Sequence, residues 1–327
     1  MQSSIFDDIW ESYSNNFDDG RSYAKFAELY DYPNGEALRS SFRRERKKRG
    51  LPSKNVKNFE ENFKEVEKIS KNSYKIPKVL LFDIETSPIL SYAWGLWNQN
   101  IYPEQILDDW FMLSWSAKWL YSDKVESNVV TSSEVLQSDD SRIVSSLWKI
   151  VNDADILIGH NAKGFDIPRS NTRFLLNKLM PPKYSKVIDT LEIAKKNFGF
   201  SSNKLDYICG MLNLDGKRKT DFSLWKKCLE GDEKSLADMR KYNEQDVNIL
   251  EDMYMVIRPW IRPHPNFGLW GEGNGMVCPN CGSDKLKEEG FYYTQVSKFI
   301  SYRCECGALS RAKQNQLGKE ERKVLLQ

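Results

Sequence analysis

Apolar positions divide the chain into a short helical start, a polar stretch and a long alternating middle. Apolar residues recur at roughly helical spacing over residues 21–32, where a Pro-Asn-Gly sequence then interrupts them. Residues 35–49 predict a second helix, because Asn34 can cap its start and Gly50 can end it. Few apolar residues occur over 53–77, which predicts a linker.

From residue 78 onward, short apolar runs alternate with helical patterns. Strands are predicted over residues 78–84, 110–118, 125–131 and 155–158. Helices are predicted over residues 142–151, 168–179, 191–196, 203–212 and 234–255. This alternation is typical of an α/β domain, here with its first strands in a meander.

A proline-rich segment, residues 259–265, closes this domain and places its boundary near 263. A small cysteine-rich module follows, with strand-like patterns over 291–296 and 299–303. No stretch approaches 18 uncharged apolar residues, and the acidic start does not fit a signal peptide. We therefore expect a cytoplasmic protein with no membrane partner.

Composition supports a folded chain and charge singles out one helix. The 327 residues are 40% hydrophobic and 13% aromatic, enough for about two domains with real cores. The net charge of +2 hides a contrast, because residues 1–38 carry two basic and eight acidic side chains, whereas residues 39–57 carry nine basic and one acidic.

The helix predicted over residues 35–49 is similar to the recognition helix of a helix-turn-helix. We expect four of its basic side chains to face outward and contact nucleic acid: Arg39, Arg43, Arg46 and Lys47. The alternative is a basic face that is merely solvated.

Carboxylates follow the predicted strands and one helix. Asp83 and Glu85 end an apolar strand two residues apart and so point to the same side of the sheet. Asp166 stands between a strand and a helix, and Tyr242 lies four residues before Asp246 on one helical face. Hard carboxylate oxygens are ligands that magnesium prefers, and two divalent ions serve phosphodiester hydrolysis. The alternative is a set of ordinary solvated acids.

The order and context of these residues resemble the DEDD superfamily of 3′-5′ exonucleases, in the branch with tyrosine in the third motif. The resemblance covers roughly residues 78–262 and rests on Asp83 with Glu85, Asn161 with Phe165 and Asp166, and Tyr242 with Asp246. It is closest to the phage and bacterial nucleases that lack a polymerase domain.

This resemblance implies an RNase H-like mixed sheet flanked by helices. It also implies that four acids hold two Mg²⁺ or Mn²⁺ ions: Asp83, Glu85, Asp166 and Asp246. Tyr242 would orient the attacking water, and Thr86, Asn161 and Phe165 would lie near the terminal nucleotide.

Four of the six cysteines cluster near the end of the chain. Cys278 with Cys281 and Cys304 with Cys306 form a C-x2-C and a C-x-C pair, which predicts a zinc ribbon with one structural Zn²⁺. The alternative is four unligated thiols. Whether the ribbon contacts nucleic acid or protein stays open.

Together these patterns predict five parts: a basic helical domain (1–57), a linker (58–77), an exonuclease domain (78–263), a zinc ribbon (270–314) and a charged tail (315–327). The predicted activity is metal-dependent 3′-5′ exonuclease action on nucleic acid, on DNA before RNA. Two alternatives stay open: a structure-specific endonuclease on the same fold, and a DNA-binding regulator whose nuclease domain only binds DNA ends.

Overall fold

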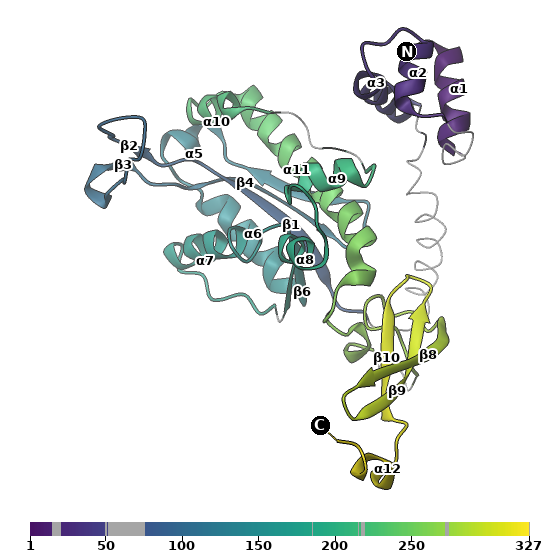
Figure 1. Ribbon diagram of the computed structural model, residues 1–327. Coiled ribbons are helices and arrows are strands. Elements are labelled where there is room, and N and C mark those ends of the chain that lie inside the picture. The colour runs from purple at the N-terminus through teal and green to yellow at the C-terminus, as the bar shows by residue number, and fades with distance from the viewer. Residues whose placement is uncertain are drawn as a thin grey trace. The chain divides into compact units, whose positions relative to one another are not determined.

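The computed structural model describes residues 1–14, 21–49, 51, 76–184, 186–214, 216, 220–271 and 275–326. The chain divides into two compact units, Met1–Glu65 and Val66–Gln327 (Figure 1). The cysteine module thus belongs to the same unit as the predicted nuclease domain. Most of the predicted linker, residues 58–75, lies outside the described residues.

The described residues of the N-terminal unit form three helices, α1 (Ser3–Ser14), α2 (Tyr23–Leu29) and α3 (Gly35–Lys48). Their shared core includes Phe6, Ile9, Phe26, Leu38 and Phe42. The predicted cap is present, because Asn34 Oδ1 accepts a hydrogen bond from the Ala37 amide at 2.8 Å. The sequence analysis did not predict α1.

The expectation that Arg46 faces outward is wrong. Leu38, Phe42 and Arg46 follow one another at four-residue steps, so they share one face of α3. That face is the buried one, and Arg46 is only 5% exposed. Arg39 is half-buried, and the side chains of Arg43 and Lys47 lie outside the described set.

The larger unit is organised around a five-stranded sheet in the order β5-β4-β1-β6-β7. Its strands are β1 (Val79–Thr86), β4 (Met112–Trp119), β5 (Val125–Val129), β6 (Ile156–Gly159) and β7 (Lys186–Asp189). Strands β1, β4 and β5 pair antiparallel, which confirms the predicted meander, and β6 and β7 add in parallel to β1. The sequence analysis had predicted no strand at β7.

Helices cover both faces of this sheet. The helices of this unit are α5 (Ser132–Leu136), α6 (Ser141–Asp153), α7 (Asp166–Leu176), α8 (Thr190–Asn197), α9 (Leu205–Met211), α10 (Phe222–Leu229) and α11 (Glu233–Ile257), and α9 and α10 pack on α11. Neighbouring side chains of β4 show the arrangement, because Ser114 Oγ donates to Asn243 on α11, whereas Trp115 Nε1 donates to the Ile143 carbonyl on α6. Successive strand residues face opposite sides, so α11 and α6 cover opposite faces.

Two small sheets complete the unit. Strands β2 (Leu90–Ser91) and β3 (Ile106–Asp108) pair in the connection between β1 and β4. Strands β8 (Leu286–Thr294), β9 (Ser297–Cys304) and β10 (Leu309–Asn315) form the cysteine module, and α12 (Lys319–Lys323) follows. Single 3₁₀ turns occur at Pro103–Gln105, Arg258–Trp260 and Phe267–Leu269. Among the described residues, no helix is long and apolar enough to cross a membrane.

Candidate metal centres and active-site cleft

Three predicted carboxylates converge on the α11 face of the sheet. Each of Asp83, Glu85 and Asp246 offers an oxygen that lies within 4.8 Å of the others. The register explains the arrangement, because Glu85 pairs with Ser114, whose hydroxyl faces α11. The donor set consists of carboxylate oxygens alone, which fits Mg²⁺ or Mn²⁺.

Asp166 stands apart from this trio although it touches the same strand. It opens α7, is 2% exposed, and accepts a hydrogen bond from the Ile84 amide at 3.1 Å. The amide of the residue between Asp83 and Glu85 therefore fixes the Asp166 carboxylate. Asp166 lies outside the group of oxygens that converge within 4.8 Å.

Asn243 is a site residue that the sequence analysis missed. It is fully buried, and its Nδ2 donates to Asp83 Oδ2 at 2.5 Å. Its Oδ1 accepts from the Ser114 hydroxyl at 3.4 Å, so the amide links Asp83 to the neighbouring strand. The only signal in the sequence was its position directly after Tyr242.

A cleft of about 690 Å³ is lined by Thr86, which follows Glu85 in β1, and by Tyr242, which lies one turn before Asp246 on α11. The three converging carboxylates are not themselves among its lining residues. The Trp225 ring packs edge-on against Tyr242 at 5.9 Å between centroids, which fixes the phenol ring. Arg169 supplies a cation at the rim, with its guanidinium carbon 4.2 Å from the Trp110 ring centroid. Trp110, Trp225 and Arg169 were not among the predicted site residues.

The two other residues predicted near the terminal nucleotide do not line this cleft. Asn161 is exposed in the loop after β6 with φ of 72°, and its amide donates to Asp189, the N-cap of α8. Phe165 is half-buried, and the Arg169 guanidinium carbon lies 5.4 Å from its ring centroid. Neither is among the residues that line the cleft.

The four clustered cysteines bring their sulfurs together. Cys278 and Cys306 Sγ are 3.7 Å apart, and Cys281 and Cys304 Sγ are 3.6 Å apart. Sulfurs placed about 2.3 Å from a tetrahedral zinc would be separated by about 3.8 Å, so the spacing fits zinc. Each pair is followed by a glycine with positive φ, 79° at Gly282 and 87° at Gly307.

Electrostatics also favours a thiolate in this cluster. Hydrogen bonding with the neighbouring cysteines holds the pKa of Cys306 below the ordinary value, and the Arg258 charge acts in the same direction. Arg258 is buried in the turn directly after α11, and its carbonyl accepts from Asn280 Nδ2 at 2.8 Å. The first cysteine turn is thereby bound to the end of the helix that carries Tyr242 and Asp246.

A buried histidine lies at the same junction. His264 Nε2 and the Tyr254 hydroxyl are 2.9 Å apart. Burial lowers the pKa of His264 from 6.5 to about 4, so the ring is neutral at neutral pH.

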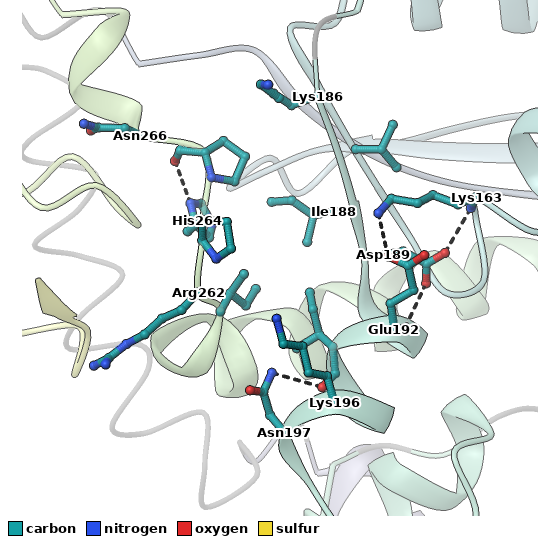
Figure 2. A pocket seen from close by; sticks show the side chains of 15 residues that line it. Lys163, Lys186, Ile188, Asp189, Glu192, Lys196, Asn197, Arg262, His264 and Asn266 are labelled. Atoms are coloured by element: carbon teal, nitrogen blue, oxygen red, sulfur yellow. Dashed lines mark hydrogen bonds and ion pairs between the residues drawn. The ribbon is translucent and has the colours of Figure 1, made fainter. Parts of the chain in front are cut away.

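A second cavity, of about 470 Å³, lies between α8 and the segment 261–266 (Figure 2). Lysines 163, 186 and 196 line it, and Lys163 forms an ion pair with Glu192 at 2.5 Å. In Figure 2 the Arg262 side chain points away from the cavity. None of the three converging carboxylates lines it.

Comparisons with known proteins found a family model and similar solved structures. Residues 118–258 match the RNase_H_2 family model, described as RNase_H superfamily. The family B DNA polymerase of the hyperthermophilic archaeon Pyrobaculum calidifontis is 16% identical with a TM-score of 0.43, and the match covers 56% of this chain and 25% of the polymerase. No match was found among curated proteins. The predicted fold class is confirmed: the five-stranded sheet and its flanking helices form an RNase H-like domain.

Proposed function

We propose that this protein is a metal-dependent nuclease that removes nucleotides from 3′ ends, with DNA as its substrate. The observation that carries the proposal is the convergence of Asp83, Glu85 and Asp246 within 4.8 Å. Converging acids on an RNase H-like sheet, whose neighbours Thr86 and Tyr242 line a cleft, suit the hydrolysis of an anionic phosphodiester. The 3′ polarity and the choice of DNA rest on the resemblance of the motifs.

In this proposal the acids hold two Mg²⁺ or Mn²⁺ ions, with Asp166 acting as a fourth ligand from the first turn of α7. When bound, such ions neutralise charge on the attacking and leaving oxygens of the phosphodiester. Asn243 fixes the Asp83 carboxylate through its 2.5 Å hydrogen bond, so the ligand does not rotate as the reaction proceeds.

Tyr242 orients the attacking water. A phenol can donate and accept hydrogen bonds without ionising, and Trp225 restrains this ring by an edge contact at 5.9 Å. Thr86 lies on the cleft wall with Tyr242, where a terminal nucleotide would sit.

We also retain Asn161 and Phe165, outside the cleft lining, and Arg39, Arg43 and Lys47 of the N-terminal unit as proposed substrate contacts. The cysteine cluster would hold one structural Zn²⁺.

The test is time-resolved digestion of 5′-labelled single-stranded DNA, duplex DNA and RNA with Mg²⁺ or Mn²⁺. We expect a ladder that shortens from the 3′ end and disappears in Asp83→Ala. Asp153→Ala, which removes an exposed carboxylate that pairs with Lys78, is the matched control and keeps the ladder. Cleavage of a circular single strand would replace the proposal with an endonuclease, and no metal-dependent cleavage at all would favour a regulator that only binds ends.

A further inference from the structure

A segment between β1 and β4 exposes large apolar side chains that the proposed chemistry does not use. This aromatic arm, residues 88–109, contains β2 and β3 and projects from the sheet (Figure 1). Its most exposed large apolar side chains are Trp94 (97%), Leu96 (91%), Trp97 (82%), Tyr92 (67%) and Tyr102 (62%). Clusters of exposed apolar side chains mark binding surfaces.

Hydrogen bonds hold the backbone of the arm while these side chains face solvent. The Tyr92 amide donates to the Gln105 carbonyl at 2.9 Å, and Gln105 Nε2 returns a bond to the Tyr92 carbonyl at 3.1 Å. The Tyr102 amide donates to Gln105 Oε1 at 2.9 Å. These bonds close the base of the segment 93–101, which carries Trp94 and Trp97, and within it Gln99 Nε2 donates to the Trp97 carbonyl at 2.7 Å. A closed base limits the conformations of the segment and so reduces the entropy cost of binding.

Both ends of the arm meet the candidate active-site cleft. Ile89, at its start, and Trp110, directly after its end, line the cleft together with Thr86 and Tyr242. Arg169 lies at the same rim, over the Trp110 ring. A nucleic-acid strand whose 3′ end reaches Tyr242 leaves the cleft across this rim. A protein partner bound to the arm would block the path of that strand.

The charge of the arm determines whether it can bind the phosphates or only the bases of a nucleic acid. Residues 88–109 contain no lysine or arginine but three carboxylates, on Glu104, Asp108 and Asp109. The arm therefore does not attract phosphates, whereas its indole rings offer flat faces for stacking on bases.

We propose that the aromatic arm stacks the bases of an unpaired strand whose 3′ end lies in the cleft, chiefly through Trp94 and Trp97. This inference rests on the proposed nuclease function and narrows its substrate to single-stranded ends. Stacking tolerates any base sequence, because every base has a flat face. The arm therefore adds affinity only through the bases. Removing its tryptophans should leave the dependence of the Kd on salt concentration unchanged.

The test measures binding without cleavage. In an Asp83→Asn background, fluorescence anisotropy gives the Kd of the full-length protein for a labelled oligothymidylate and for a matched abasic oligomer of the same length. The double variant Trp94→Ala/Trp97→Ala should bind oligothymidylate at least about 30-fold more weakly, since each lost stack costs about fivefold or more. Its Kd for the abasic oligomer should equal that of the parent.

Control variants separate stacking from folding. Trp94→Phe/Trp97→Phe keeps flat rings and should restore most of the affinity. Trp260→Ala removes a tryptophan that is 61% exposed but lies outside the arm and the cleft, and it should leave both Kd values unchanged.

Two results would overturn the inference: an unchanged Kd for oligothymidylate in the alanine variant, or an equal loss for the abasic oligomer. If the Kd is unchanged and light scattering shows that the variant has dissociated from an oligomer, the arm is a contact between copies. The binding readout does not depend on cleavage, so this failure is distinguishable from a digestion assay that shows no nuclease activity.

Discussion

The two candidate metal centres of the larger unit are built in opposite ways. The cysteine centre is local, because two short turns, each followed by a positive-φ glycine, bring four sulfurs together. The acidic centre joins distant parts of the chain, since Asp83 and its hydrogen-bond partner Asn243 are 160 residues apart. One centre can form from its own turns, whereas the other exists only once β1 and α11 have packed.

The two centres also differ in the chemistry of their ligands and in their exposure. The four thiols are mostly buried and contact one another, which suits a closed structural site for a soft-ligand metal. Asp83 and Glu85 are only half-buried, which suits an ion that exchanges and shares its coordination with substrate. The comparison predicts that the two centres can be disabled separately.

The largest expected effect is on the cysteine centre. Cys281→Ser should lose zinc and unfold the module, because structural zinc sites contribute about 10–16 kcal/mol of apparent binding free energy to folding. Elemental analysis and limited proteolysis between residues 278 and 306 measure this. Cys228→Ala, which removes a buried thiol elsewhere, should keep its zinc. Full zinc content in Cys281→Ser would contradict the assignment.

The next effect is on the acidic centre. Asp83→Asn should lower the cleavage rate by about 10³-fold, because a metal ligand contributes several kcal/mol of transition-state stabilisation and about 1.4 kcal/mol is tenfold in rate. Zinc content and thermal stability should stay at the wild-type level. A rate within tenfold of wild type would remove Asp83 from the proposed chemistry.

A third effect concerns the junction between the centres. Burial lowers the pKa of His264 to about 4, so between pH 6.5 and about 4 the unfolded chain binds a proton that the folded chain does not. The stability present above pH 6.5 should therefore be lost as pH falls through this range, by up to about 3 kcal/mol. Urea unfolding at several pH values measures the slope, which His264→Gln should flatten. An unchanged slope in that variant would mean that other titratable groups cause the pH dependence of stability.

The smallest effect tests positioning. Asn243→Ala should lower kcat by about 10- to 100-fold, as expected for a partner that orients a metal ligand. It should also weaken Mn²⁺ binding, which a merely structural role would not do. Asn248→Ala, an exposed amide on the same helix, is the matched control. Equal behaviour of the two variants would show that the bond to Asp83 is dispensable.

Much of the fold was predictable because its signals are local. The apolar runs at β1, β4 and β6 and the helical periods of α6, α7 and α11 lie close to their predicted ranges. Strand β7 is as short as β6 but has only two apolar residues, Val187 and Ile188, between Lys186 and Asp189, so its pairing with β6 depends on tertiary contacts that no local pattern reports. Arg46 was misplaced for a related reason, because outward orientation was assigned from charge while the buried stripe of α3 continues through it.

The candidate site, like the fold, was predictable only where its signals are local. The convergence of Asp83, Glu85 and Asp246 agrees with the spacing of the motifs, whereas their role as metal ligands stays a prediction. Asn243 could not be found from sequence, because nothing in its own segment reports that Asp83 lies within 2.5 Å of its amide. Trp110 and Arg169 were missed because the cleft is assembled from five separate parts of the chain.

The most direct test of two independent metal centres is a Mn²⁺ titration, followed by electron paramagnetic resonance, of full-length zinc-loaded protein and of Asp83→Asn. We predict that both proteins retain one zinc ion per chain through dialysis and that only the wild type binds Mn²⁺ tightly. Equal Mn²⁺ binding by the two proteins, or loss of zinc together with Mn²⁺ binding in Asp83→Asn, would contradict the account.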